Sequence, residues 1–250
     1  MRIYLSEDYK AMSRRAANII SAQVITKPDS VLGLATGGTP VGAYQQLVEW
    51  YKKGDLSFAE IKTVNLDEYL GLSPHHEQSY RYFMQVNLFD HIDIKPENTH
   101  VLNGLAKDPQ AECAAYNQLI RDLGGIDLQL LGMGHNGHIA FNEPGDDFGL
   151  ETHVVTLTDR TIDANTRFFE SRDEVPRHAL SMGIKNIMQA RRILIVVSGE
   201  EKAETVCKAF AGPVTKDVPA SVLQLHPDVT LVGDRAALRK LVEAGVPVCG

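Results

Sequence analysis

Short aliphatic segments alternate with amphipathic segments along the chain, and few folds are compatible with this order. Segments rich in Val, Ile and Leu predict an edge strand over 2–5, a buried strand over 31–35, and further strands over 61–66, 127–131, 193–197 and 229–232. Helical spacing and helix-start residues predict a first helix that begins at Ser6 or Asp8, and others over 40–53, 79–91, 111–123, 199–210 and 235–244. This order predicts a single α/β domain over residues 1–250, with a mostly parallel sheet and helices on both faces.

Charge and cysteine usage exclude several classes of protein. The net charge of −7 argues against a nucleic-acid surface and against binding to an anionic membrane. The 3 cysteines are widely spaced and form no C-x-x-C motif, which indicates a reduced protein without a disulfide framework or zinc knuckle. The N-terminal residues lack the apolar core of a signal peptide, and the longest aliphatic run, 193–197, is too short to span a bilayer. We therefore expect a cytoplasmic protein.

The run 130–145 (LLGMGHNGHIAFNEPG) places Asn136, His138, Asn142 and Glu143 in a glycine-rich loop directly after a predicted strand. Glycine tolerates positive φ and lets the backbone approach a ligand closely. A carboxylate five residues from a histidine can fix the imidazole tautomer and support its charged form, which gives an acid/base pair. The alternative is a polar turn whose histidine is merely hydrogen-bonded. The density of functional side chains favours a catalytic loop.

A second polar turn follows the predicted strand 31–35. Its backbone N–H groups, its hydroxyls and the start of the next helix suit one phosphate group better than a dinucleotide. The residues concerned are Thr36, Gly37, Gly38 and Thr39. Thr39 could also cap that helix, and Pro40 suits its first turn. Gly-Gly turns between a strand and a helix are common, so this motif alone leaves a purely structural role open.

Asp67 follows the predicted strand 61–66 and has two interpretations. It is either a solvated turn residue or a half-buried base at the carboxyl edge of the sheet, where α/β proteins bind ligands. A base there can take a proton from a carbon next to a carbonyl or imine.

Two basic residues are candidates for contacting a phosphate, Arg167 in the amphipathic stretch 164–169 and Lys202 just after 193–197. Arg suits bidentate contact and Lys a point charge. Each residue is also commonly a solvated surface residue. The polar stretch 158–182 around Arg167 predicts a mobile lid.

The 9 histidines raise the question of a metal site. Their only clusters are His75 with His76 and His135 with His138, and the zinc-protease motif H-E-x-x-H is absent. We therefore expect no metal.

Five motifs occur in a characteristic order: LGLATGGTP (32–40), NLDEYLGL (65–72), GMGHNGHIAFNEPG (132–145), ANTRFF (164–169) and VPASVLQLHP (218–227). Together they resemble the glucosamine-6-phosphate deaminase family over nearly the whole chain. The resemblance implies a modified Rossmann-like fold. It also implies the reaction of D-glucosamine 6-phosphate and water to D-fructose 6-phosphate and ammonia, in amino-sugar catabolism and without a cofactor.

The resemblance also implies roles for the candidate residues. His138 would open the sugar ring, oriented by Glu143 and Asn136, and Asp67 would move a proton from C2 to C1. The substrate phosphate would be held by the glycine loop and the two basic residues: Thr36, Gly37, Gly38, Thr39, Arg167 and Lys202. Some family members have Asp where this chain has Asn136, and a neutral amide supports less positive charge on His138, so the pH profile is expected to differ.

Two other functions share part of this pattern. A 6-phosphogluconolactonase would use the same phosphate loop and a histidine but has no need for a base at Asp67. A sugar-phosphate-sensing module would carry a DNA-binding extension or lack catalytic residues. The presence of Asp67, His138 and Glu143 favours the deaminase.

In allosteric members of the family, N-acetylglucosamine 6-phosphate binds between subunits through basic residues shortly after the catalytic loop and an aromatic near a longer C-terminus. Here the corresponding positions hold His153 and Val155, and the chain ends at Gly250. The same stretch carries three acidic residues: Asp146, Asp147 and Glu151. Because these acids would repel a phosphate, we expect no activator site, and a monomer or small homo-oligomer.

Overall fold

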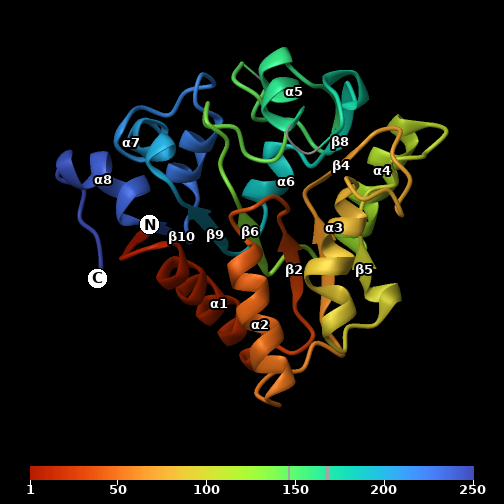
Figure 1. Cartoon of the computed structure of the whole chain (residues 1–250), viewed down its shortest axis with the longest axis horizontal. Helices are drawn as coiled ribbons and strands as arrows, with labels where there is room; N and C mark the ends of the chain where they lie inside the picture. The colour runs from red at the N-terminus through yellow and green to blue at the C-terminus, as the bar shows by residue number, and fades with distance from the viewer. Residues whose placement is uncertain (146, 167–168) are drawn as a thin grey trace.

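The computed structural model describes residues 1–145, 147–166 and 169–250. Within them, the centre of the molecule is a seven-stranded parallel sheet (Figure 1). Its strands, in their order across the sheet, are β1 (Arg2–Ser6), β10 (Val229–Asp234), β9 (Ile193–Val197), β6 (Leu128–Leu131), β2 (Val31–Leu34), β3 (Lys62–Asn65) and β5 (Thr99–His100). The predicted single α/β domain with a mostly parallel sheet is confirmed.

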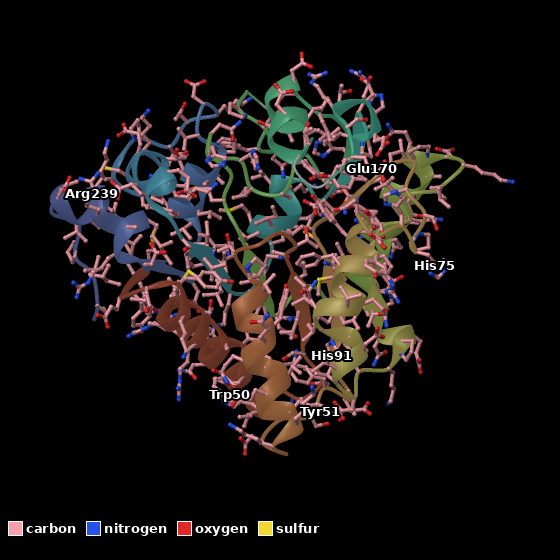
Figure 2. All side chains as sticks on the ribbon, in the orientation of Figure 1. Trp50, Tyr51, His75, His91, Glu170 and Arg239 are labelled. Atoms are coloured by element: carbon pink, nitrogen blue, oxygen red, sulfur yellow. The ribbon has the colours of Figure 1, made fainter. Side chains whose placement is uncertain are left out.

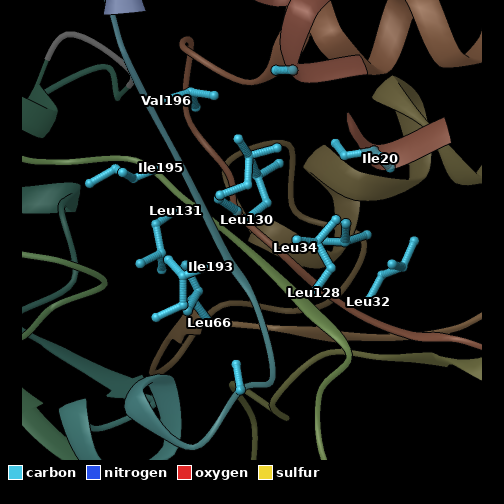
Figure 3. Packing of buried hydrophobic residues seen from close by; sticks show 14 of the residues in the cluster. Ile20, Leu32, Leu34, Leu66, Leu128, Leu130, Leu131, Ile193, Ile195 and Val196 are labelled. Atoms are coloured by element: carbon cyan, nitrogen blue, oxygen red, sulfur yellow. The ribbon is translucent and has the colours of Figure 1, made fainter. Parts of the chain in front are cut away.

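The strand sequences are almost continuously apolar because helices cover both faces of the sheet. Every residue of β9 (ILIVV) is buried. In Figure 3, Leu131 and Ile193 lie on one side of the strand ribbons, while Leu34, Leu128 and Leu130 gather on the other. This two-sided core holds the strand ends in fixed positions.

Within the part of the chain that the structure describes, the helices are those predicted, with shifted ends, and two short ones in addition. They are α1 (Tyr9–Thr26), α2 (Val41–Lys52), α3 (Tyr80–Asn87), α4 (Pro109–Asp122), α5 (Asp159–Asn165), α6 (Ile184–Met188), α7 (Ala203–Ala211) and α8 (Arg235–Glu243). Short 3-10 turns are η1 (Phe89–His91), η2 (Pro96–Asn98), η4 (Arg172–Glu174), η5 (Glu200–Lys202) and η6 (Pro219–Leu225). Helices α1 and α2 pack together, α7 and α8 do likewise, and the two pairs lie on opposite sides of β9 and β10 (Figure 1).

Helix starts follow the chemistry of their capping residues. Asp8, not Ser6, caps α1, because its carboxylate accepts a hydrogen bond from the N–H of Ala11 at 2.7 Å. At α2 the expectation was wrong in two details. Pro40 is itself the N-cap residue, so Thr39 lies one position before the cap, and the helix has no hydrogen bond from an N-cap side chain. The predicted helix 199–210 divides into η5 and α7 after Gly199, which has a φ of +98°.

A second, three-stranded antiparallel sheet was not predicted. It consists of β4 (Asp67–Tyr69), β8 (His178–Ser181) and β7 (His153–Thr156). The chain passes from the central sheet to this small sheet at Leu66, whose N–H donates to Leu34 O (3.3 Å) and whose carbonyl accepts from Met182 N–H (2.7 Å). The small sheet therefore places the residues after β3 beside the carboxyl edge of the central sheet. No helix of the described residues is long and apolar enough to cross a membrane.

Candidate active site

A cavity of about 390 Å³ lies at the carboxyl ends of the central strands. Nearly all the site residues predicted from the sequence line this cavity. Those that line it are Thr36, Gly37, Gly38, Thr39, Asp67, Asn136, His138 and Lys202. Glu143 lies behind His138, and Arg167 falls outside the residues that the structure describes.

Asp67 is buried, so its interpretation as a solvated turn residue is excluded. Its side chain lines the cavity and only 8% of the residue is exposed. Its backbone pairs with Ser181 in the antiparallel sheet. Burial, and then the charge of the neighbouring Glu68, raise the pKa of Asp67 to about 8. A carboxyl group with such a pKa can accept and return a proton near neutral pH.

His138 and Glu143 form the expected pair. His138 Nδ1 lies 3.4 Å from Glu143 Oε1, and Glu143 is only 6% exposed. Asn136 donates from Nδ2 to Glu143 Oε2 at 2.5 Å and accepts the N–H of His138 at 3.2 Å. Asn136 thus links the backbone of His138 to the Glu143 carboxylate. An ionised aspartate at position 136 could not make this link, because it has no proton to donate to the carboxylate.

The electrostatics keep Glu143 ionised. Burial by itself raises the pKa of Glu143, but contact with His138 and hydrogen bonds from Thr161 and Asn136 outweigh it and lower the pKa to about 2. Glu143 therefore carries a negative charge at neutral pH and can stabilise a proton on His138.

Glycines are required where His138 packs against its own loop. A Cβ on Gly134 would lie 2.2 Å from the imidazole, closer than any real contact. Gly134 N–H also donates to His138 O at 2.9 Å, and Gly137 has a φ of +87°. Asn142 has a structural role, because its buried side-chain amide donates to Ile139 O at 2.8 Å and to Met182 O at 2.9 Å.

The glycine loop presents open backbone to the cavity. Gly37 has a φ of +86°, and a Cβ on Gly37 or Gly38 would meet no atom of residues 1–145, 147–166 and 169–250 within 4 Å. From α1, the hydroxyl of Tyr9 donates to Gly38 O (3.0 Å) and accepts the N–H of Gly42 (2.9 Å), which supports the loop from behind. No local sequence pattern indicates this contact between α1 and the loop.

Lys202 reaches the cavity from η5, after β9. The turn that leads to it is held by Asp234 at the end of β10. Asp234 accepts hydrogen bonds from the Ser198 hydroxyl and from the N–H of Gly199 (3.1 Å), and it also caps α8 through the N–H of Ala237 (2.8 Å). Two neighbouring strand ends therefore fix the position of Lys202.

Sequence reasoning missed Thr161 and the aromatic wall of the cavity. Thr161 on α5 donates from Oγ1 to Glu143 Oε1 at 2.6 Å. Tyr69 packs against Tyr80 and Phe169 with ring centroids 4.9 and 5.9 Å apart. Only the capping signal at Thr158, three residues before Thr161, was visible in the sequence, and it does not show that Thr161 meets Glu143.

The histidine clusters do not form a metal-binding group in the structure as described. Over 1–145, 147–166 and 169–250, no group of three or more His, Cys, Asp or Glu side chains is arranged to hold a metal ion. His75 lies at the outer edge of the molecule (Figure 2).

Comparison with known proteins identifies the family. A family model described as glucosamine-6-phosphate isomerases/6-phosphogluconolactonase matches residues 6–232. A glucosamine-6-phosphate deaminase from Lachnoclostridium phytofermentans is 61% identical over 232 residues, which are 93% of this chain and 98% of the relative. One from Clostridium perfringens is 51% identical over 241 residues, 96% of this chain and 100% of the relative.

Solved structures agree with this relationship. The structure of a monomeric glucosamine-6-phosphate deaminase has a TM-score of 0.94 at 50% identity, covering 96% of this chain and 100% of that one. A 6-phosphogluconolactonase from Trypanosoma brucei has a TM-score of 0.77 at 17% identity, covering 96% and 98%, which shows a shared fold only. The chain therefore belongs to the glucosamine-6-phosphate deaminase family.

Proposed function

We propose that this protein converts D-glucosamine 6-phosphate and water to D-fructose 6-phosphate and ammonia. The observation that carries the proposal is one cavity that is lined by Asp67, a buried carboxyl group with a pKa of about 8, by His138 with its partner Glu143, and by the open glycine loop. Family membership at 50–61% identity supports the same reaction.

In the proposed first step, His138 opens the pyranose ring. The imidazole takes the proton of the anomeric hydroxyl and returns it to the ring oxygen as the C1–O bond to that oxygen breaks. The step needs an imidazole that alternates between neutral and charged forms. The ionised Glu143, 3.4 Å from Nδ1, supports the charged form and fixes the ring.

In the proposed second step, Asp67 takes the C2 proton of the open-chain aldehyde. The electron pair left at C2 forms the C1–C2 double bond of an enolamine as the carbonyl oxygen on C1 takes up a proton from solvent. Asp67 then returns its proton to C1, and the nitrogen releases one proton to solvent. The resulting imine at C2 is hydrolysed by water, which releases ammonia and leaves the ketone. Burial suits Asp67 to this task, because a raised pKa makes its carboxylate a stronger base.

The substrate phosphate is proposed to lie on the loop at 36–39, with Lys202 and Arg167 as cationic partners. The exposed backbone at Gly37 and Gly38 suits an anion. Binding energy from the phosphate, which does not react, can then be used to place C1 and C2 between His138 and Asp67.

Three further features belong to the proposal. Residues 158–182 act as a lid over the cavity. The protein is cytoplasmic, and it works as a monomer or a small homo-oligomer without an activator site. A solved relative that is monomeric supports the expectation of a monomer or small homo-oligomer.

The test is a coupled assay of the purified chain that follows fructose 6-phosphate and ammonia separately. Equal amounts of both products are expected from glucosamine 6-phosphate, and none from the N-acetylated or non-aminated sugar phosphates. Hydrolysis of 6-phosphogluconolactone by the same preparation, without ammonia release from the amino sugar, would replace the proposal by the lactonase.

A further inference from the structure

The Glu143 carboxylate receives a hydrogen bond from α5, which lies outside the glycine loop. Thr161 Oγ1 donates to Glu143 Oε1 at 2.6 Å. This is the same carboxylate oxygen that faces His138 Nδ1 at 3.4 Å. The other oxygen, Oε2, accepts from Asn136. Support for Glu143 thus comes from two parts of the chain, the glycine loop and α5.

A hydrogen bond from Thr158 determines that the Thr161 hydroxyl donates its own proton to Glu143. The N–H of Thr161 donates to Thr158 Oγ1 at 3.2 Å, so that Thr158 caps α5. The Thr158 hydroxyl in turn donates to Thr161 Oγ1 at 3.0 Å. Since Thr161 Oγ1 receives this hydrogen bond, its own proton is available for the carboxylate. The chain of bonds runs in one direction, and each bond strengthens the next.

The contact is more than a general feature of threonine in this helix. Thr166, at the other end of α5, donates its hydroxyl back to Ile162 O at 2.9 Å, which is a usual arrangement for a helical threonine. Thr161 is buried, and its hydroxyl points to the carboxylate instead. A buried hydroxyl bond to a charged group is among the stronger hydrogen bonds in proteins.

We propose that Thr161 is a positioning residue for ring opening, which holds Glu143 against His138 from α5. The inference rests on the proposed function and assigns a task to α5. The Thr161 hydroxyl completes the support of the acid/base pair, so ring opening depends on the position of α5 against the glycine loop.

The test compares Thr161→Val with Thr161→Ser and a control. Valine keeps the branched shape and removes the donor, so kcat for glucosamine 6-phosphate should fall by about 10- to 100-fold. Affinity for an acyclic 2-amino-hexitol 6-phosphate, which needs no ring opening, should stay within about two-fold of wild type. Serine should restore most of kcat. Thr166→Val, which removes a hydroxyl of the same helix without touching Glu143, is the matched control.

A double-mutant cycle with Glu143→Ala shows whether Thr161 acts through Glu143. Once the carboxylate is absent, adding Thr161→Val should change kcat by less than about two-fold. An equal loss in both backgrounds, or wild-type kcat in Thr161→Val, would overturn the inference. Urea unfolding of the same four proteins tests the hydrogen bond without turnover. If the bond exists, the shifts of the unfolding midpoint caused by the two substitutions are non-additive. If the wild type releases no ammonia, the proposed function fails, while the unfolding cycle still decides whether the contact exists.

Discussion

Asp67 lies beside a second buried carboxyl group. Glu68 points into the peptide framework, where it accepts N–H bonds from Tyr69, Tyr80 and Arg81 at 2.8 to 2.9 Å. Burial raises the pKa of Glu68, and these three bonds act against that shift by stabilising its charged form. Glu68 therefore fixes β4 to the start of α3 and at the same time helps to keep the pKa of Asp67 high.

Replacing Asp67 by Asn should abolish proton transfer at C2. Exchange of the C2 hydrogen with deuterated solvent, followed by mass spectrometry, should slow by about 10²- to 10⁴-fold because the general base is gone. Binding of an acyclic substrate analogue should be nearly unchanged. Exchange at the wild-type rate in the variant would exclude Asp67 as the base.

The same substitution should stabilise the protein at high pH. The pKa of Asp67 is about 8 in the folded chain, and the reference value for an unperturbed Asp is 3.8. Between pH 3.8 and 8 the folded state therefore holds a proton that the unfolded state has released. Stability contributed by the protonated form is fully present below pH 3.8 and is lost as the pH rises through 8. At pH 8, Asp67→Asn should therefore melt above wild type by roughly 3–10 °C.

This stability difference should shrink as the pH approaches 4, which melting curves at several pH values would show. Asp29→Asn is the matched control, because Asp29 is exposed and the substitution should have the same small effect at every pH. A variant that melts below wild type at pH 8 would contradict the buried, protonated state of Asp67.

At the scale of elements, the site is assembled from strand ends that belong to two sheets. Parallel strands end at one edge, which brings the loop after β2 and the loop after β6 together. The small antiparallel sheet adds Asp67 from β4, next to β8. At the other side of the cavity, the ends of β9 and β10 are joined through Asp234, which orders the turn that carries Lys202.

Removing the Lys202 charge should weaken substrate binding more than turnover. Lys202→Ala should raise KM by about 10- to 100-fold, since a charge-assisted contact of this kind contributes roughly 1.5–3 kcal/mol. Steady-state kinetics would measure it. Lys208→Ala is the matched control, because Lys208 lies exposed on α7 and pairs with Glu204 at 3.6 Å. If glucosamine without its phosphate reacts as well as the ester, the phosphate site is assigned wrongly.

For the protein as a whole, the surface formed by residues 151–155, which follow the catalytic loop, is relevant to allosteric activation. Glu151 is paired with Lys185 at 2.8 Å and with Arg121 at 3.9 Å, so its charge is balanced more than the sequence suggested. His153 is turned back to Glu151 O, and Val155 is buried. The positions expected to bind an activator phosphate in allosteric relatives are thus engaged in local contacts.

We therefore predict that the enzyme is not activated by N-acetylglucosamine 6-phosphate. Rate against glucosamine 6-phosphate concentration should be hyperbolic, and the added compound should at most compete with substrate. Kinetic titrations with and without the compound, and with inorganic phosphate as the ionic control, measure this. Sigmoidal curves that become hyperbolic when the compound is added would contradict the prediction.

The parts of the fold that the sequence predicted are those with strong local patterns. The ILIVV segment is β9 without a change of boundary, and the first helix begins at its Asp8 cap. The loop with His138 and Glu143 was found in the same way, because its glycines and side chains are close together in the chain. In each case, residues within about one turn or one strand carry the information.

Local patterns were sufficient to predict the central α/β sheet apart from β5, the helices that cover it, and the loops at its carboxyl edge. The small antiparallel sheet, the burial of Asp67 and the bond from Thr161 to Glu143 follow from long-range packing instead. Asp67 pairs with Ser181, more than a hundred residues away, and the two-residue β5 is too short to have a pattern. Burial and pairing of this kind depend on which distant segments the chain brings together, and no local pattern of side chains records that.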